Sequence, residues 1–525
     1  MLRMFVLTIG VTLTAAVITA RTAVPLPAAG TSCELLATVK LPDTEIVRAE
    51  LIAAGAFTPA EAAQPAQGRG GRGGNAFASL PSFCRVVATL KPTNDSNIHV
   101  EVWLPSAEWN GKFQASGGAA GANSAVAGGI NYPAMATSIR AGYATAGTDN
   151  GHQGATLSFA VNHPEKLVDF GYRATHEMTV KAKSIIEAFY GNGPRYSYWN
   201  ACAAGGRQGL QEAQRYPADY DGIVVTAPAN TWSRLQTWSM WLNQVANQQP
   251  GGVIPPQKYP AIHRAVVEQC DALDGVTDGI LENPTRCRPK LDVLTCQNGD
   301  NNDCLTPPQL ETARAILSPA VDNASRRTVY PAIEPGSELG WAAITGPTVP
   351  YYATETFKYL VFNDPNWTPQ ARSINLGADV ATAERVTAPI TADNPDLSSF
   401  FARGGKLIQV HGWTDPLIVP GDSIDYYNRV RARVGESVAE RSLRLFMVPG
   451  MNHCQGGEGA DTIEMQSVIE RWVEQSQAPA AAVASKVLNG QVQRTHLLCP
   501  YPQEAVFKRA GSPDDANNFE CRIVK

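Results

Sequence analysis

The sequence predicts an α/β fold, and three patterns carry this prediction. Short stretches rich in β-branched and aromatic residues alternate with helical stretches, which is typical of a sheet covered by helices. This alternation stops near residue 229 and returns near residue 397. A strand, a tight turn and a helix also follow one another directly over residues 198–209.

The individual elements follow from local patterns. Strands are expected at residues 85–90, 98–104, 143–148, 222–226, 406–410 and 443–448, and helices within residues 165–190 and 423–434. Residues 111–121 (GKFQASGGAAG) are too rich in glycine for packed structure, so we expect a loop there. Its backbone N–H groups can face an anion, although a plain tight turn has the same composition.

The turn within residues 198–209 is the most informative stretch. Aromatic residues before Asn200 suit a buried strand, and a helical pattern from Leu210 stops at Pro217. Small residues fill the turn because the two backbones must pass within contact distance. In α/β-hydrolases this geometry is the nucleophile elbow, whose central residue presents a side-chain oxygen above the sheet. Here that position holds Ala203, which has no such oxygen.

Composition limits the classes of function. The chain has 525 residues, of which 44% are hydrophobic and 17% charged, so a large core is expected rather than disorder. The formal net charge is −5, and no dense basic block is present in the sequence. This balance argues against nucleic acid as a partner.

The N-terminus resembles a secretory signal. Arg3 precedes an apolar stretch at residues 4–20, and small alanines follow it as candidate cleavage sites. We therefore expect residues 1–29 to be a signal peptide and linker, a secreted or periplasmic protein, and no membrane association after cleavage. A single membrane anchor is the alternative. The ten cysteines fit export, because disulfides form in oxidising compartments.

Composition shifts also divide the chain. We expect residues 30–228 and 397–525 to form the two parts of one α/β domain, with residues 229–396 inserted between them as a second domain. The insert is rich in Trp, Pro, Asn and Gly. Residues 67–74 (QGRGGRGG) are expected to form a flexible loop.

An acid and a base follow the elbow in the order nucleophile, acid, base. Asp415 comes after the strand expected at 406–410, and His453 comes after that at 443–448. In such a pair the acid orients the imidazole, which takes the proton of the nucleophile. His152 also ends an expected strand, but we interpret it as a structural loop histidine.

Two cysteines adjoin this constellation. Cys202 precedes Ala203, and Cys454 follows His453. A bridge between them would close a loop of about 250 residues, worth roughly 5 kcal/mol of unfolded-state entropy, and would fix the base loop to the elbow. Two unrelated buried thiols are the alternative.

An acidic loop at residues 271–280 suggests calcium. Its carboxylates and carbonyl groups are the hard oxygen ligands that Ca²⁺ prefers, and the expected ligands are Asp271, Asp274, Val276, Asp278 and Ile280. The loop resembles an EF-hand but lacks its final glutamate. We predict a structural ion, with a plain acidic turn as the alternative.

Together these motifs resemble the tannase and feruloyl esterase family, to which mono(2-hydroxyethyl) terephthalate hydrolase also belongs. The family elbow Cys-Ser-x-Gly-Gly-Arg is similar to residues 202–207, the closing His-Cys to residues 453–454, and the acid motif Gly-x-x-Asp to residues 412–415. Residues 169–173 (DFGYR) and 227–229 (APA) are also family-like. The resemblance covers nearly the whole mature chain.

The resemblance implies an α/β-hydrolase fold with a large inserted lid domain that carries the calcium loop. It implies esters of aromatic acids as substrates and an oxyanion hole made by the N–H of Ala204 with Gly118 and Ala119. Lid aromatics would grip the ring, although core packing explains them nearly as well; the candidates are Trp341, Phe357, Phe362 and Trp367. The implied disulfides are Cys33–Cys84, Cys202–Cys454, Cys270–Cys287, Cys296–Cys304 and Cys499–Cys521.

The departure from the family lies at its centre, since Ala203 stands where members have the nucleophilic serine. Loss of that serine costs on the order of a millionfold in rate. We therefore expect a secreted carboxylic ester hydrolase of the tannase and feruloyl esterase type, impaired by Ala203, with an inactive binder of aromatic esters as the alternative. The alanine is either inherited or engineered to trap a bound ester. A third possibility is that a water activated by His453 replaces the serine as the nucleophile. A metal-dependent hydrolase using the aspartate loop is a weaker possibility.

Overall fold

The computed structural model describes residues 30–59, 77–118 and 126–524. The expected signal peptide and linker at residues 1–29 and the expected flexible loop at residues 67–74 lie outside the described residues. Within the described ranges, no helix combines the length and apolar character needed to span a membrane.

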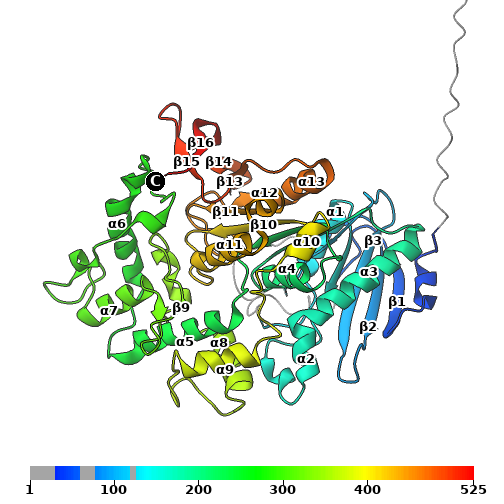
Figure 1. The fold of residues 1–525 in the computed structure, drawn as a ribbon, viewed down its shortest axis with the longest axis horizontal. Coiled ribbons are helices and arrows are strands. Elements are labelled where there is room, and N and C mark those ends of the chain that lie inside the picture. The colour runs from blue at the N-terminus through cyan, green and yellow to red at the C-terminus, as the bar shows by residue number, and fades with distance from the viewer. Residues whose placement is uncertain (1–29, 60–76, 119–125, 525) are drawn as a thin grey trace, which may run out of the picture.

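A nine-stranded sheet organises the described part of the chain (Figure 1). In spatial order its strands are β1 (Thr44–Ile52), β2 (Phe83–Leu90), β3 (Ile98–Pro105), β5 (Ala144–Thr148), β4 (Lys112–Ala115), β6 (Tyr196–Cys202), β7 (Gly222–Thr226), β10 (Lys406–Gly412) and β11 (Leu443–Val448). The strands from β1 to β5 pair antiparallel, and those from β5 to β11 pair parallel. The carboxyl ends of the parallel strands therefore share one edge, where α/β proteins place their sites.

Helices cover both faces of this sheet. Met178, Leu210 and Tyr426 pack against one face in the largest apolar cluster, whereas Ile469 and Met135 pack against the other. The helices of this part are α1 (Tyr132–Arg140), α2 (Pro164–Val168), α3 (Ala174–Tyr190), α4 (Ala204–Arg215), α10 (Ser398–Ala402), α11 (Pro420–Val434), α12 (Glu436–Ser442) and α13 (Met465–Gln475). A π-helical turn at Asp169–Arg173 joins α2 to α3.

Residues 229–396 form a mainly helical body beside the sheet, green to yellow in Figure 1. Its elements are α5 (Trp232–Gln248), α6 (Tyr259–Cys270), α7 (Pro307–Ile316), β8 (Ala320–Val321), β9 (Thr328–Tyr330), α8 (Tyr351–Glu355) and α9 (Ala378–Val386). A separate apolar cluster that includes Trp238 and Trp341 forms its interior. The chain ends in small antiparallel sheets made by β12 (Thr462–Ile463), β13 (Ala482–Leu488), β14 (Gln491–Leu498), β15 (Glu504–Phe507) and β16 (Phe519–Arg522).

The predicted elements agree with the structure except within residues 111–121. The glycine-rich stretch 111–121 was predicted to be a loop, but its residues Lys112–Ala115 form β4, a central strand. Four strand residues between glycines are too few to give a periodic pattern. Strand β1 was not predicted, because it lies at the sheet edge, where a largely exposed strand shows little apolar alternation.

The elbow requires glycine because α4 crosses β6 at contact distance. A methyl group added to Gly209 would lie 2.5 Å from Cδ1 of Trp199, and one added to Gly205 would lie 2.9 Å from the carbonyl of Gly117. Such distances do not occur between real side-chain carbons and their neighbours, so larger residues would push the helix away from the sheet.

We predict that Gly209→Ala destabilises the protein by about 1–3 kcal/mol, since the added methyl overpacks the contact with Trp199 even though alanine favours a helix. Gly193→Ala is the matched control, because no atom lies within 4 Å of its added methyl. Chemical denaturation would measure both. Equal stability of the two variants would contradict the packing argument.

Candidate active site

The backbone of the elbow is strained at its central residue, Ala203. Ala203 has φ 53° and ψ −114°, a conformation that costs residues with a Cβ on the order of 1–3 kcal/mol. Two backbone hydrogen bonds hold it there: Ala203 N–H donates to Thr226 O (3.0 Å), and Ala229 N–H donates to Ala203 O (3.1 Å). The structure thus forms a nucleophile elbow that presents a methyl group.

Asp415 follows β10 and is fully buried, with its carboxylate surrounded by donors. One oxygen accepts from the N–H groups of Leu417 (2.8 Å) and Ile418 (3.0 Å), and the other accepts from His453 Nδ1 (2.8 Å). Burial opposes ionisation, but the charge of His453 and the hydrogen bonds from His411 and His453 outweigh it. The pKa of Asp415 therefore lies well below its usual value.

A second buried imidazole also contacts the acid. His411 Nε2 lies 3.3 Å from the same oxygen of Asp415 and 2.8 Å from the carbonyl of Ile418. Both atoms only accept, so this nitrogen carries the proton. His411 Nδ1 lies 2.7 Å from the hydroxyl of Ser423. Sequence reasoning gave His411 no role, although it directly precedes the motif at residues 412–415.

His453 follows β11 and supplies the imidazole of the site. Its Nδ1 is bonded to Asp415, which leaves Nε2 as the nitrogen that can act on another group. Burial of the ring opposes protonation, but the charge and hydrogen bond of Asp415 outweigh it, so the pKa of His453 lies above its usual value. The arrangement is that of an oriented general base.

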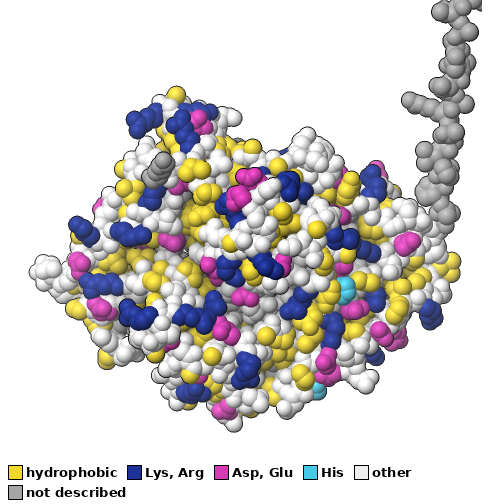
Figure 2. Space-filling model, viewed as in Figure 1, with side chains coloured by type: hydrophobic (Ala, Val, Ile, Leu, Met, Phe, Trp, Pro, Cys, Tyr) yellow, Lys and Arg dark blue, Asp and Glu magenta, His cyan; other side chains and the backbone are white. Residues whose placement is uncertain are grey.

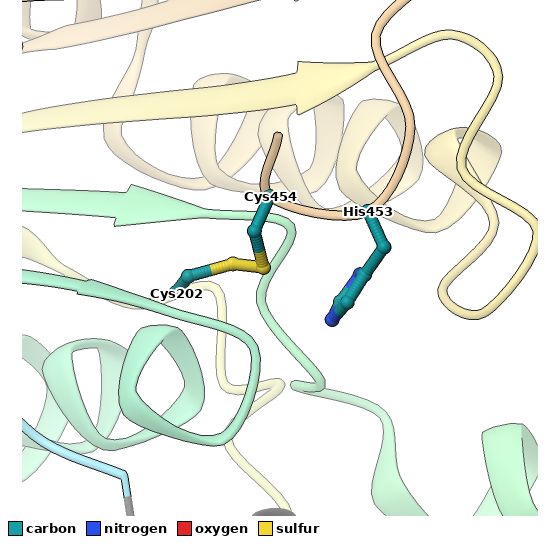
Figure 3. Close-up of side chains that lie close together, drawn as sticks. All are labelled: Cys202, His453 and Cys454. Carbon is teal, nitrogen blue, oxygen red and sulfur yellow. A yellow bond between two sulfur atoms is a disulfide. The ribbon is translucent and has the colours of Figure 1, made fainter. Parts of the chain in front are cut away.

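A disulfide joins the base loop to the elbow. Cys202 and Cys454 are bonded, with their Cα atoms 6.1 Å apart. A ring nitrogen of His453 and the two sulfurs all lie within 4.8 Å of one another, and Figure 3 shows the imidazole beside the bridge. The residues next to His453 and Ala203 are thus covalently linked. The other four pairs implied by the family resemblance also form.

The expected oxyanion donors are only partly placed. Ala204 begins α4, so its N–H has no acceptor within the helix. The Gly118 N–H, by contrast, donates to Oε1 of Gln208 (2.8 Å) and is already engaged. Gln208 in turn donates to Asn150 (2.8 Å), which ties this loop to α4 and to the end of β5. Ala119 lies outside the described residues.

The four lid aromatics proposed to grip a substrate ring pack among core residues instead. Trp341 and Phe357 are fully buried, and Trp341 donates from its indole N–H to Ser337. Phe357, Phe362 and Trp367 pack against one another with ring centroids 5.0–6.4 Å apart. Core packing accounts for Trp341, Phe357 and Trp367, whereas Phe362 is only partly buried and lies beneath the guanidinium of Arg372.

His152 has a structural position. Its ring is buried, its Nε2 lies 3.0 Å from the carbonyl of Val126, and it stacks on Phe159. Burial lowers the pKa of His152. This agrees with its interpretation as a loop histidine.

Residues 84–522 match the sequence model of a family described as tannase and feruloyl esterase. The chain belongs to this family. It is 35% identical to an uncharacterized esterase of Xanthomonas campestris pv. campestris, over 94% of this chain and 91% of that protein. It is 34% identical to a probable feruloyl esterase B-2 of Aspergillus fumigatus, over 84% of this chain and 86% of that protein.

The crystal structure of feruloyl esterase B from Aspergillus oryzae superposes on this chain with a TM-score of 0.84 at 28% identity, covering 93% of this chain and 99% of that one. The chain therefore has the α/β-hydrolase fold of the tannase and feruloyl esterase family. As a member of this family, it is a carboxylic ester hydrolase.

We predict that Asp415→Asn lowers the pKa of His453, because loss of the negative charge leaves burial as the dominant influence. NMR titration of the His453 imidazole would measure the change. Asp425→Asn, at an exposed surface pair with Arg429, is the control. An unchanged pKa in Asp415→Asn would contradict the electrostatic coupling.

Proposed function

We propose that this protein binds esters of aromatic carboxylic acids over the elbow and hydrolyses them slowly, because Ala203 lacks the attacking oxygen. One observation supports this most directly: Asp415 and His453 are paired at 2.8 Å beside an elbow that is strained but carries a methyl group. The acid, the imidazole and the elbow backbone are thus all present around the position of the missing oxygen.

With serine at position 203, the proposed reaction follows the two-step course of serine esterases. The hydroxyl attacks the ester carbonyl while His453 takes its proton, the acyl group is transferred to the oxygen, and the alcohol leaves with that proton. Water activated by His453 then releases the acid. Asp415 keeps the imidazole oriented throughout, and the N–H of Ala204 faces the developing oxyanion.

The proposed substrate class rests on the relatives. The A. fumigatus and A. oryzae proteins carry the name feruloyl esterase B, and feruloyl esters are esters of an aromatic acid. Because the chain aligns with both over most of its length, we infer that its substrate also carries an aromatic acyl group.

A non-catalytic binder is the second candidate, and Ala203 itself favours it. An oxyanion hole and a binding site without the serine retain roughly 10³-fold catalysis over water. Binding of methyl ferulate without measurable hydrolysis would identify the chain as a binder. Slow turnover that is lost in His453→Ala would identify a water activated by the imidazole.

We predict that Ala203→Ser raises the rate of methyl ferulate or methyl gallate hydrolysis by several orders of magnitude, up to on the order of a millionfold. The strained backbone already holds the position from which the hydroxyl would attack. Initial rates with these esters and with p-nitrophenyl acetate would measure the gain.

The control for this experiment is the double variant Ala203→Ser/His453→Ala, in which the hydroxyl has no base. It should return to the rate of the unaltered chain. Equal and robust rates for the unaltered chain and Ala203→Ser would show that the chemistry lies elsewhere in the molecule.

We also propose a structural Ca²⁺ at the loop of residues 271–280. A small cavity there is lined by Asp274, Val276, Asp278 and Ile280, together with Glu282, which sequence reasoning missed. Its volume of about 20 Å³ suits one ion. Burial raises the pKa of Asp274 to about 6 and also raises that of Asp278, so a bound cation would stabilise their charged forms.

Asp271 has a different place in this loop. It does not line the cavity, and its carboxylate accepts from the N–H groups of Asp278 (3.3 Å) and Gly279 (3.1 Å). His496 also lines the cavity, but its Nε2 lies 2.8 Å from a carboxylate oxygen of Glu282. The carboxylate and carbonyl oxygens of Asp274, Val276, Asp278 and Ile280 fit calcium. In this proposal Asp271 shapes the loop and those four residues supply the ligands.

We predict that chelation and Asp274→Asn each lower the thermal unfolding midpoint, because at about 100 times its dissociation constant an ion contributes about 2.7 kcal/mol. Differential scanning calorimetry with EDTA and with added CaCl₂ would measure it. The control Asp292→Asn removes a mostly exposed carboxylate paired with Arg314. An unfolding midpoint that changes with neither EDTA nor CaCl₂ would refute the calcium proposal. Loss of activity on chelation without loss of stability would favour the metal-dependent hydrolase.

The proposed partner is a small ester, and the proposed location is secreted or periplasmic. The five disulfides indicate an oxidising compartment. Basic and acidic side chains are interspersed over the described residues of the face in Figure 2, rather than gathered in a basic stripe that could follow a nucleic-acid backbone.

A further inference from the structure

The loop that carries His453 is held by more than its disulfide. Lys486 on β13 donates to the carbonyl of Gly457 (2.7 Å) and lies 3.4 Å from Asp461, so the C-terminal sheet supports one side of the loop. Glu458, in the same loop, pairs with His263 on α6 of the lid. The base loop therefore lies between two other parts of the molecule.

One contact of this loop with the lid is an ion pair made by a histidine. His263 on α6 places Nε2 at 2.8 Å from Glu458 and Nδ1 at 2.9 Å from Glu338. The Glu338 side chain is fully buried, and its second oxygen accepts from the N–H of Gly336 (2.9 Å). Because both ring nitrogens face carboxylates, both carry protons, and His263 is an imidazolium bridging two anions.

We propose that His263 is a positioning residue that fastens the lid to the base loop and so keeps His453 aligned with the elbow. The disulfide fixes the loop at Cys454, and backbone hydrogen bonds from Asn452 to Gly456 (3.1 Å) and from Gly459 to Gly450 (3.0 Å) close the loop on itself. The contact at Glu458 ties this closed loop to the lid, four residues after Cys454. The catalytic part of this inference rests on the proposed function, whereas the mechanical part does not.

The bridge is sensitive to alkaline pH. Burial of the ring lowers the pKa of His263, but the hydrogen bonds to Glu338 and Glu458 outweigh this effect and raise it to about 9. Because the folded value lies above the ordinary value of 6.5, the stabilisation is complete below pH 6.5 and is lost as pH rises through about 9. The charged groups around the bridge are Glu338 on the lid, Glu458 on the base loop and, beyond it, Lys486.

Hydrogen exchange of the full chain tests the bridge directly. We expect His263→Gln and Glu458→Gln to speed amide exchange in residues 453–459 by about tenfold or more at pH 7, since the loop opens more often. The unaltered chain should approach the variants at pH 10 after correction for intrinsic rates. Arg264→Gln is the matched control, because the neighbouring side chain on α6 makes only an exposed pair with Asp303.

Glu458→Gln keeps the test decisive if His263→Gln fails to fold, because the Glu458 side chain is half exposed. Exchange in residues 453–459 that matches the unaltered chain in Glu458→Gln, or in a folded His263→Gln, would overturn the proposal. So would equal acceleration by Arg264→Gln.

Kinetics in the Ala203→Ser background test the catalytic part. We expect Ala203→Ser/Glu458→Gln to lose about 10- to 100-fold in kcat with little change in KM, because substrate binding is kept and the base is misplaced. The alkaline limb of the pH profile near 9 should also disappear. If Ala203→Ser itself is inactive, the proposed function fails, and hydrogen exchange still decides whether the bridge exists. Unchanged kcat in an active background would overturn the positioning role.

Discussion

The site depends on one covalent constraint, the disulfide between Cys202 and Cys454. Cys202 ends β6 and Cys454 lies in the loop after β11, 252 residues later. Two strands of the sheet, β7 and β10, lie between β6, which leads to the elbow, and β11, which leads to the base loop. Without the bond, non-covalent packing alone would have to place the imidazole to within a fraction of an ångström. The bond removes that freedom in the folded state and much of it in the unfolded chain.

The helical body at residues 229–396, the expected lid, forms part of this framework. A methyl group added to Gly340 would lie 2.7 Å from Pro416, beside the acid, and one added to Gly450 would lie 3.4 Å from Ile280 of the acidic loop. The lid therefore touches the loops that carry both Asp415 and His453. The contact between the acidic loop and the base loop could not be predicted, because the acidic loop is more than a hundred residues from both Asp415 and His453 in the sequence.

Much of the site could be predicted because it consists of local motifs. Elbow, acid and base each follow a strand, and parallel strands bring such loops to one edge. The missed features are those that only packing defines. The contact of His411 with Asp415, Glu282 at the small cavity and the engagement of Gly118 by Gln208 all arise from distant segments or from side-chain direction. Strand β4 was missed for a local reason, since four residues give no period.

The positive φ at Ala203 also bears on how the site could change over time. Glycine adopts such a backbone without strain, so replacement of Ala203 by glycine would relieve the strain at this position. The shape of the turn is instead held by hydrogen bonds involving Thr226 and Ala229. A serine at position 203 would thus add one oxygen atom to a backbone that already has the required conformation.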